Sequence, residues 1–191
     1  MEMTYDFSTH IVPLTLAISQ VKGDVLELGT GSVSTPLLHG LCMFTKPQRK
    51  IVTLEENPSW LGMMQKDFEC PWHSFRHALC MESVLEFLES AEWKFGVALI
   101  DQCFDGSSSP ETGMTYGSRK RCAKVCARIC DVIVIHDSDY WDFKDDEDWN
   151  SFVESFKYQW KFKLTGPETL VLSNVFDVKA VLVDSPQGVL S

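Results

Sequence analysis

The feature that most constrains this chain is the segment 25–35, which reads VLELGTGSVST. A short apolar run containing Glu27 is followed by Gly29 and Gly31, and small polar residues then open an amphipathic stretch. This pattern predicts a strand, a tight turn and a helix, because glycine permits turn conformations and lets a ligand approach the backbone. The free N–H groups at the helix start can hold a carboxylate, and Glu27 can accept hydrogen bonds from an ammonium. The segment therefore fits the head group of an amino acid.

Apolar runs rich in Val, Ile and Leu alternate with helical patterns along the chain, which is typical of a parallel sheet covered on both faces. We expect strands at residues 25–28, 51–54, 74–78, 97–100, 132–135, 158–164 and 169–173. We expect helices at residues 10–20, 35–44, 59–68, 83–90, 119–129 and 146–156. Only a short turn joins the last two strands, so they should pair antiparallel. The prediction is one α/β domain over residues 1–191, a three-layer sandwich with a seven-stranded, mostly parallel sheet that ends in a hairpin. Residues 1–22 would form an N-terminal cap segment.

Composition excludes several classes of protein. No apolar run approaches the roughly 20 residues of a membrane span, and the N-terminus lacks the pattern of a signal peptide. The seven cysteines form no CxxC pair, which favours reduced thiols and a cytoplasmic location. The formal net charge of −10 argues against nucleic acid as a partner. Because no span is present in the sequence pattern, we expect no membrane partner.

A candidate helix at residues 119–129 carries two local patterns. Its basic residues, from Arg119 to Arg128, form either a solvated helix face or a local basic patch, and we favour the solvated face. Cys122, Cys126 and Cys130 are spaced by four residues, so they would share one face of a helix. Three thiols in a line make a poor tetrahedron for a metal, which favours a buried face of small residues.

The motif formed by Glu27, Gly29 and Gly31 resembles the opening motif of class I S-adenosylmethionine-dependent methyltransferases, and its Ser-Thr-x-Leu-Leu continuation looks like small bacterial-type members. The usual third glycine is Val33 here, so the turn should differ locally. The predicted sheet with its terminal hairpin is a second resemblance to that Rossmann-like family, and it covers nearly the whole chain. The resemblance implies the cofactor S-adenosyl-L-methionine, held at its methionine end by Glu27, Gly29, Gly31 and Thr35.

Residues that follow the strands should line the ligand site, because open α/β sheets bind ligands at the carboxyl ends of their strands. Glu55 and Glu56 follow the second strand, and Glu55 lies at the spacing from the glycine turn at which an acid reaches ribose hydroxyls. The alternative is a surface acid before a helix that Asn57 or Ser59 caps. After the third strand the family's adenine-site aspartate is missing, and the resemblance leaves the backbone of Cys80 and Met81, with the Met81 side chain, to frame the adenine.

Asp101, His136 and Asp137 are the candidate catalytic residues, because they follow the fourth and fifth strands, which should be neighbours. The resemblance places Asp101 near the cofactor or the acceptor. His136 could take a proton from a substrate at neutral pH, or it could be a structural histidine bonded to Asp101 or to a backbone carbonyl. Asp101 and Asp137 could instead bind Mg²⁺ or Ca²⁺, as in catechol-type O-methyltransferases. Because the third ligand is replaced by Ser138 and the accompanying lysine is absent, we assign no metal ligand.

Further candidates surround this edge. The resemblance suggests that the N-terminal segment, with Tyr5, Thr9 and His10, covers the methionine end of the cofactor, whereas Ser8 or Thr9 could simply cap the first helix. The segment 102–117 is rich in Ser, Gly and Pro and should shape the acceptor pocket. Aromatic residues of a second loop could line the same pocket or equally pack under the acidic run 145–148: Tyr140, Trp141 and Phe143.

These features together predict a methyltransferase that acts on a hydroxyl, amine or thiol of a small molecule. The alternative is a module that binds S-adenosylmethionine or S-adenosylhomocysteine without turnover, a pseudoenzyme. A nicotinamide cofactor is disfavoured, because Glu27 would repel a pyrophosphate at the turn. The apolar tail 175–190 would form either a homodimer interface or a cover for the edge of the sheet.

Overall fold

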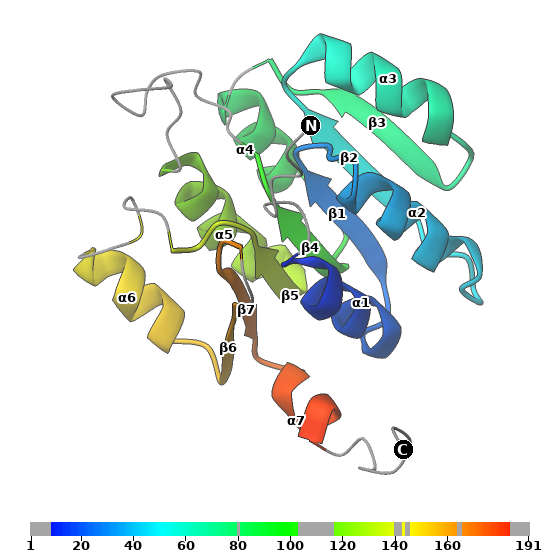
Figure 1. The fold of residues 1–191 in the computed structure, drawn as a ribbon. Coiled ribbons are helices and arrows are strands. Elements are labelled where there is room, and N and C mark those ends of the chain that lie inside the picture. Colours follow the sequence, from blue (N-terminus) through cyan, green and yellow to red (C-terminus); the bar gives the residue numbers. More distant parts are fainter. Residues whose placement is uncertain are drawn as a thin grey trace.

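The computed structural model describes residues 9–79, 81–102, 117–139, 143, 146–163 and 166–183. Its centre is a seven-stranded sheet in the order β3-β2-β1-β4-β5-β7-β6 (Figure 1). The strands are β1 (Asp24–Leu28), β2 (Ile51–Glu55), β3 (His73–His77), β4 (Phe95–Ile100), β5 (Cys130–Ile135), β6 (Tyr158–Phe162) and β7 (Thr169–Ser173). The first five strands pair in parallel, and β7 pairs antiparallel with both β5 and β6. The predicted fold class is confirmed, and β4 and β5 are neighbours as expected.

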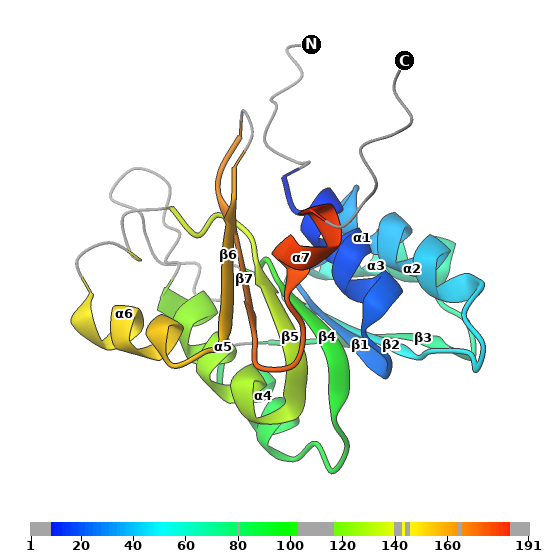
Figure 2. The same ribbon diagram turned by 90° about the horizontal axis from the view of Figure 1, so that it is seen from below.

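Helices cover both faces of the sheet. They are α1 (Ile11–Gln20), α2 (Ser34–Met43), α3 (Pro58–Phe68), α4 (Met81–Glu89), α5 (Gly117–Ile129), α6 (Glu147–Glu154) and α7 (Val178–Val183). In Figure 2, α1, α2, α3 and α7 lie on one side of the sheet, and α4, α5 and α6 lie on the other. Six helices were predicted to within a few residues, and α7 was not predicted. No helix in the described part of the chain combines the length and apolarity needed to cross a bilayer.

Strand residues alternate between the two layers of core. Leu26, Ala98 and Ile133 pack with α4, α5 and α6, whereas Val25 and Val97 pack with α1 and α2. Both sets are almost completely buried, which explains why these strands appear in the sequence as continuous apolar runs. Because the central strands are parallel and in register, the polar residues that follow them meet at one edge of the sheet.

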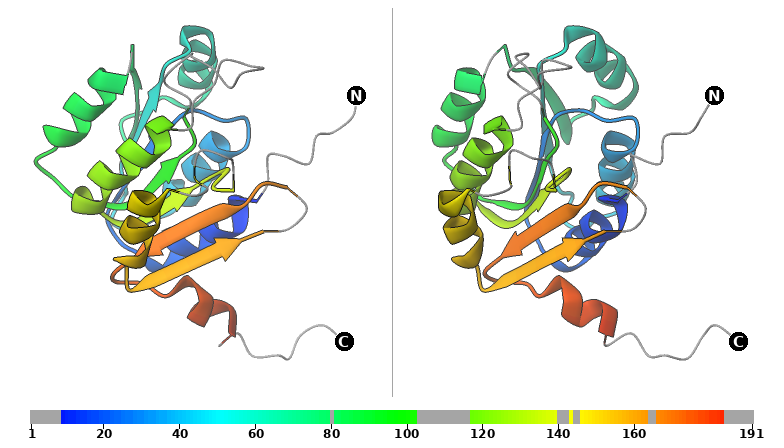
Figure 3. Two further views of the ribbon diagram at one scale, coloured as in Figure 1. Left: turned by 90° about the vertical axis from the view of Figure 1, so that its left-hand side faces the viewer. Right: turned by 60° about the vertical axis from the view of Figure 1, so that its left-hand side comes forward.

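The C-terminal hairpin extends the sheet beyond β5, and α7 follows it (Figure 3). Helix α7 packs against α1 and β6, and Val178 is buried there. This placement agrees with the cover predicted for the apolar tail, whereas a homodimer interface stays a prediction. On α5, Cys122 and Cys126 are buried as expected, but Cys130 begins β5 and does not continue the helix.

Candidate functional site

The turn after β1 is built around Gly29. Its φ of 90° lies in the left-handed region, and a Cβ added to it would meet the carbonyl oxygen of Asp101 at 2.8 Å. Only glycine fits here, and the turn therefore lies directly against the end of β4. Within the described residues, the backbone N–H groups of Ser32 and Val33 have no hydrogen-bond acceptor. These groups are the free donors that the sequence predicted for an anionic ligand.

We expect Gly29→Ala to lower the free energy of unfolding by at least about 1–3 kcal/mol, the cost of a non-glycine residue held at such a φ. Gly40→Ala is the matched control, because nothing lies within 4 Å of the added Cβ and the residue sits inside α2. That variant should be neutral or more stable by up to about 1 kcal/mol. Urea denaturation of both variants measures the difference, and equal stabilities would contradict the role given to Gly29.

Glu27 is fully buried beneath this turn. Its carboxylate accepts hydrogen bonds from Ser34 Oγ at 2.8 Å, Thr35 Oγ1 at 3.0 Å and Thr53 Oγ1 at 2.8 Å. Burial raises its pKa to about 7, although the three hydroxyl donors oppose that shift. Thr35 Oγ1 also accepts from the N–H of Gly31 at 3.1 Å, so Glu27 and Thr35 hold the turn from below. The direct contact of Glu27 with a ligand ammonium stays a prediction.

A pocket of about 240 Å³ lies at the carboxyl edge of the sheet. Its lining combines the glycine turn with residues after β2 and β4: Gly29, Thr30, Glu55, Glu56, Asn57, Trp60, Asp101 and Gln102. The volume is somewhat below the roughly 300–1,000 Å³ of typical ligand sites. Gly29, Glu55, Glu56 and Asp101 were predicted to bind ligand and do line one pocket. Trp60 was missed, because a tryptophan in the first turn of a helix gives no signal of its own.

Glu55 joins the carboxyl ends of β1 and β2 by hydrogen bonds. Its Oε2 accepts from the N–H of Thr30 at 2.6 Å and from Thr30 Oγ1 at 2.7 Å, and its Oε1 accepts from the N–H of Asn57 at 2.7 Å. Asn57 caps α3 through Ser59 and Trp60, as the sequence suggested. Glu55 is only 6% exposed, so it is not the surface acid of the alternative interpretation.

The three candidate catalytic residues do meet. His136 Nδ1 lies 3.1 Å from Asp101 Oδ1 and 3.4 Å from Asp137 Oδ1. Burial lowers the pKa of His136, but the hydrogen bond to Asp101 and the charges of both carboxylates outweigh burial, so the pKa is raised. Asp137 has a left-handed φ of 55°, an uncommon conformation for a residue other than glycine.

Arg119, on α5, organises these carboxylates, and the sequence did not indicate this. Its guanidinium contacts Asp101 Oδ1 at 3.0 Å and Asp137 Oδ2 at 2.9 Å. It also donates to the carbonyl oxygens of Gln102 at 2.9 Å and His136 at 2.6 Å. With 2% exposure, Arg119 does not belong to a solvated basic face, so that prediction was wrong for this residue. The bridging guanidinium stands between the two carboxylates that a magnesium ion would share.

Three other basic residues of α5 pair with acids, as expected for a helix face that meets solvent. Lys120 contacts Asp146 at 2.7 Å, Lys124 pairs with Asp148, and Arg128 lies 3.7 Å from Glu89. Asp146 also caps α6 by accepting from the N–H of Trp149 at 2.9 Å.

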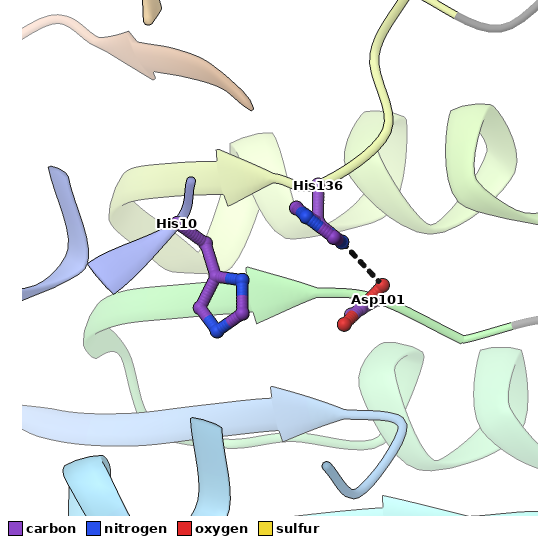
Figure 4. Close-up of side chains that lie close together, drawn as sticks. All are labelled: His10, Asp101 and His136. Atoms are coloured by element: carbon purple, nitrogen blue, oxygen red, sulfur yellow. Dashed lines mark hydrogen bonds and ion pairs between the residues drawn. The ribbon is translucent and has the colours of Figure 1, made fainter. Parts of the chain in front are cut away.

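The start of α1 reaches the same cluster. Thr9 Oγ1 lies 3.2 Å from His136 Nε2 and accepts from Thr169 Oγ1 at 3.3 Å. The N-cap of α1 is His10, with no side-chain cap hydrogen bond, so the capping role considered for Thr9 was wrong. His10 lies beside His136 and Asp101, at the ends of β5 and β4 (Figure 4).

Several predicted site residues fall outside the described residues: Tyr5, Ser8, Cys80, Tyr140, Trp141 and all of the segment 102–117 except its two ends. Met81 begins α4, and its side chain is not described. Phe143 is 5% exposed and packs against Trp149, with ring centroids 5.2 Å apart. Phe143 is therefore packed in the core, and it is not among the residues that line the described pocket.

Comparisons with known proteins support the fold. No protein-family model matches the sequence, and neither does any curated protein. The structure is similar to the O-methyltransferase from Bacillus cereus in complex with S-adenosylhomocysteine (SAH), at 13% identity and a TM-score of 0.61, over 86% of this chain and 80% of that one. It is similar to the O-methyltransferase TomG from Streptomyces achromogenes, which is involved in tomaymycin synthesis and was solved with S-adenosylmethionine (SAM), at 14% identity and a TM-score of 0.61, over 86% and 78% of the two chains.

The spermidine synthase from Thermotoga maritima also matches, at 14% identity and a TM-score of 0.55, over 91% of this chain and 61% of that one. At these identities the likeness establishes the architecture. The chain has the Rossmann-like fold of class I SAM-dependent methyltransferases.

Proposed function

We propose that this protein is a SAM-dependent methyltransferase that modifies a hydroxyl, amine or thiol of a small molecule. The observation that supports it most strongly is the pocket in which the Gly29–Thr30 turn, Glu55 and Asp101 converge. Two O-methyltransferases with this fold were determined with SAH or SAM bound. The combination of fold and pocket favours the same cofactor here.

The described residues suit the parts of this cofactor. Glu55 Oε1 accepts one hydrogen bond in the structure, which leaves acceptor capacity for a ribose hydroxyl. The N–H groups of Ser32 and Val33 suit the carboxylate of the methionine end. Trp60, which is 40% exposed, offers an aromatic face to the adenine. Glu56, Gly31 and the backbone of Cys80 and Met81 keep the ligand roles predicted from the sequence.

Bound SAM would supply a methyl group activated by a sulfonium: the acceptor atom would bond to the methyl carbon, and the electron pair of the broken S–CH₃ bond would stay on sulfur. The protein must then orient the acceptor and receive its proton. We assign the proton to His136, because the carboxylates of Asp101 and Asp137 raise its affinity for protons. Asp101 lies next to the pocket and would orient the acceptor.

Calorimetric titration with SAH and SAM tests the cofactor assignment. We expect about micromolar affinity for the wild type and a loss of about tenfold or more in Glu55→Gln, because the amide offers fewer acceptor sites to the ribose. Glu154→Gln, an exposed change on α6, is the matched control and should bind normally. Tighter binding of NAD than of SAH, or equal affinity in the two variants, would refute the proposal.

A binding module without turnover is the second candidate, and Arg119 favours it because the guanidinium already engages two of the three candidate catalytic side chains. Release of SAH from SAM in the presence of small hydroxyl, amine and thiol acceptors distinguishes the candidates. Acceptor-dependent release supports the enzyme, whereas tight binding with no release for any acceptor class supports the module.

A further inference from the structure

His10 is a buried polar side chain that the proposed methyl transfer does not use. It is 3% exposed, and neither Nδ1 nor Nε2 has a hydrogen-bond partner among the described residues. An imidazole with both nitrogens unsatisfied is costly to bury, so such a group calls for a partner that the protein alone does not supply. A neutral imidazole carries one free lone pair, with which it can bind a metal ion.

The surroundings of His10 supply the other elements of a metal site. One ligand atom each from His10, Asp101 and His136 lies within 4.8 Å of the others. The rings of His10 and His136 meet edge to face, with centroids 4.8 Å apart. Figure 4 shows the three side chains gathering from the start of α1 and the ends of β4 and β5.

We propose that His10, Asp101 and His136 bind one divalent transition-metal ion of borderline softness, such as Zn²⁺, Co²⁺ or Fe²⁺. Two imidazoles and one carboxylate form a donor set that these ions prefer, whereas Mg²⁺ prefers oxygen ligands. Metal–ligand bonds of about 2.1 Å place neighbouring ligand atoms about 3.0–3.4 Å apart. The contact of 3.1 Å between Asp101 and His136 already meets this spacing. The ligand atom of His10 lies within 4.8 Å of the other two, so a shift of its ring toward them would complete the set.

The groups around the cluster would support the ion. Arg119 also contacts Oδ1 of Asp101, at 3.0 Å, and would hold this carboxylate in place. The hydroxyls of Thr9 and Thr169 form a chain to His136 Nε2, which fixes the ring with Nδ1 toward Asp101. Two carboxylates and one guanidinium leave the cluster with one net negative charge when both imidazoles are neutral. A divalent cation is therefore electrostatically acceptable despite the neighbouring arginine.

This site does not depend on the proposed function, because it needs no cofactor. If both hold, His136 would be a ligand of the ion and would not also take the acceptor's proton. The ion would lie beside the pocket that Asp101 also lines, where it could bind an acceptor oxygen directly and make its hydroxyl more acidic.

Titration of chelator-treated protein with Co²⁺ tests the proposal, because a bound Co²⁺ ion shows a visible d–d absorption band. We expect one equivalent to bind the wild type, Zn²⁺ to displace it and Mg²⁺ not to displace it. His10→Ala should weaken binding by about tenfold or more, the range seen even for loss of an outer partner of a metal ligand. His39→Ala is the matched control, because His39 pairs with His73 in another part of the fold, at 3.1 Å between their Nδ1 atoms.

His10→Phe separates a loss of metal binding from a loss of folding, because it keeps a buried ring and removes both unsatisfied nitrogens. It should melt at or above the temperature of the metal-free wild type and lose the further stabilisation that Zn²⁺ gives the wild type. No Co²⁺ binding, binding unchanged in His10→Ala, or binding lost in His39→Ala would overturn the proposal. A strong thiolate-to-cobalt charge-transfer band would do so as well, since it would show that cysteines hold the ion.

Discussion

Replacing Arg119 by methionine is expected to lower the free energy of unfolding by about 3–5 kcal/mol at neutral pH, the cost of removing one partner from a buried ion pair. The change leaves the carboxylates of Asp101 and Asp137 without the guanidinium that each contacts at 3.0 and 2.9 Å. It also removes the donor that joins the carbonyl groups at the ends of β4 and β5. His136 offsets part of the loss, because it still faces both carboxylates.

Arg128→Met is the matched control for this prediction, because it makes the same substitution on the same helix. The partner there is Glu89 at 3.7 Å, and the two side chains are 65% and 60% exposed. Exposed pairs contribute about 0–1 kcal/mol, so this variant should unfold close to the wild type. Urea denaturation measures both variants. If Arg119→Met lost no more stability than Arg128→Met, Arg119 would not organise the cluster.

Glu27→Gln should change the pH dependence of stability. The pKa of Glu27 is raised by burial to about 7 from a model-compound value of 4.5, so the stabilisation it gives is complete below the unfolded pKa and is lost as pH rises through 7. A difference of this size corresponds to about 3 kcal/mol, at 1.36 kcal/mol for each pKa unit. Relative to the wild type, the glutamine variant should therefore gain about 3 kcal/mol between about pH 5 and about pH 8.

Denaturation curves of both proteins at the two pH values measure this gain, and the difference between them removes the contribution of His136, which titrates in both. His73, which contacts Thr53 Oγ1 at 3.0 Å, does not confound the result. Burial lowers its pKa to about 3, so in the folded state of both proteins its ring is neutral from about pH 5 to about pH 8. If the free energy of unfolding changed by the same amount with pH in both proteins, the result would contradict a raised pKa of Glu27 in the folded state.

Much of the fold could be predicted from the sequence, because continuous apolar strands and the short 165–168 turn leave few arrangements for the chain. The place of the pocket followed for the same reason. Glu55 ends β2 and Asp101 follows β4, and these parallel strands lie on either side of β1. The register of the sheet alone therefore brings both residues to the glycine turn. Helix α7 was missed, because it has only six residues and little amphipathic pattern.

The organisation of the site could not be predicted in the same way. Arg119 stands among the basic residues of α5, and only the packing of that helix shows that this one side chain turns inward to the strand ends. His10 and Thr9 lie more than 120 residues from His136 in the chain, as the contact between Thr9 and His136 shows. Local patterns carry no information about such contacts, whereas Gly29 could be interpreted because its left-handed turn is a local requirement.

The measurement that tests the central claim most directly is a crystal structure of the protein grown with SAH. The account predicts SAH in the pocket at the carboxyl edge, with its ribose hydroxyls on Glu55 and its amino-acid end at the turn of Gly29 and Gly31. A pocket that stays free of SAH at a saturating concentration, or SAH bound at another place on the fold, would contradict the assignment of this pocket to the cofactor.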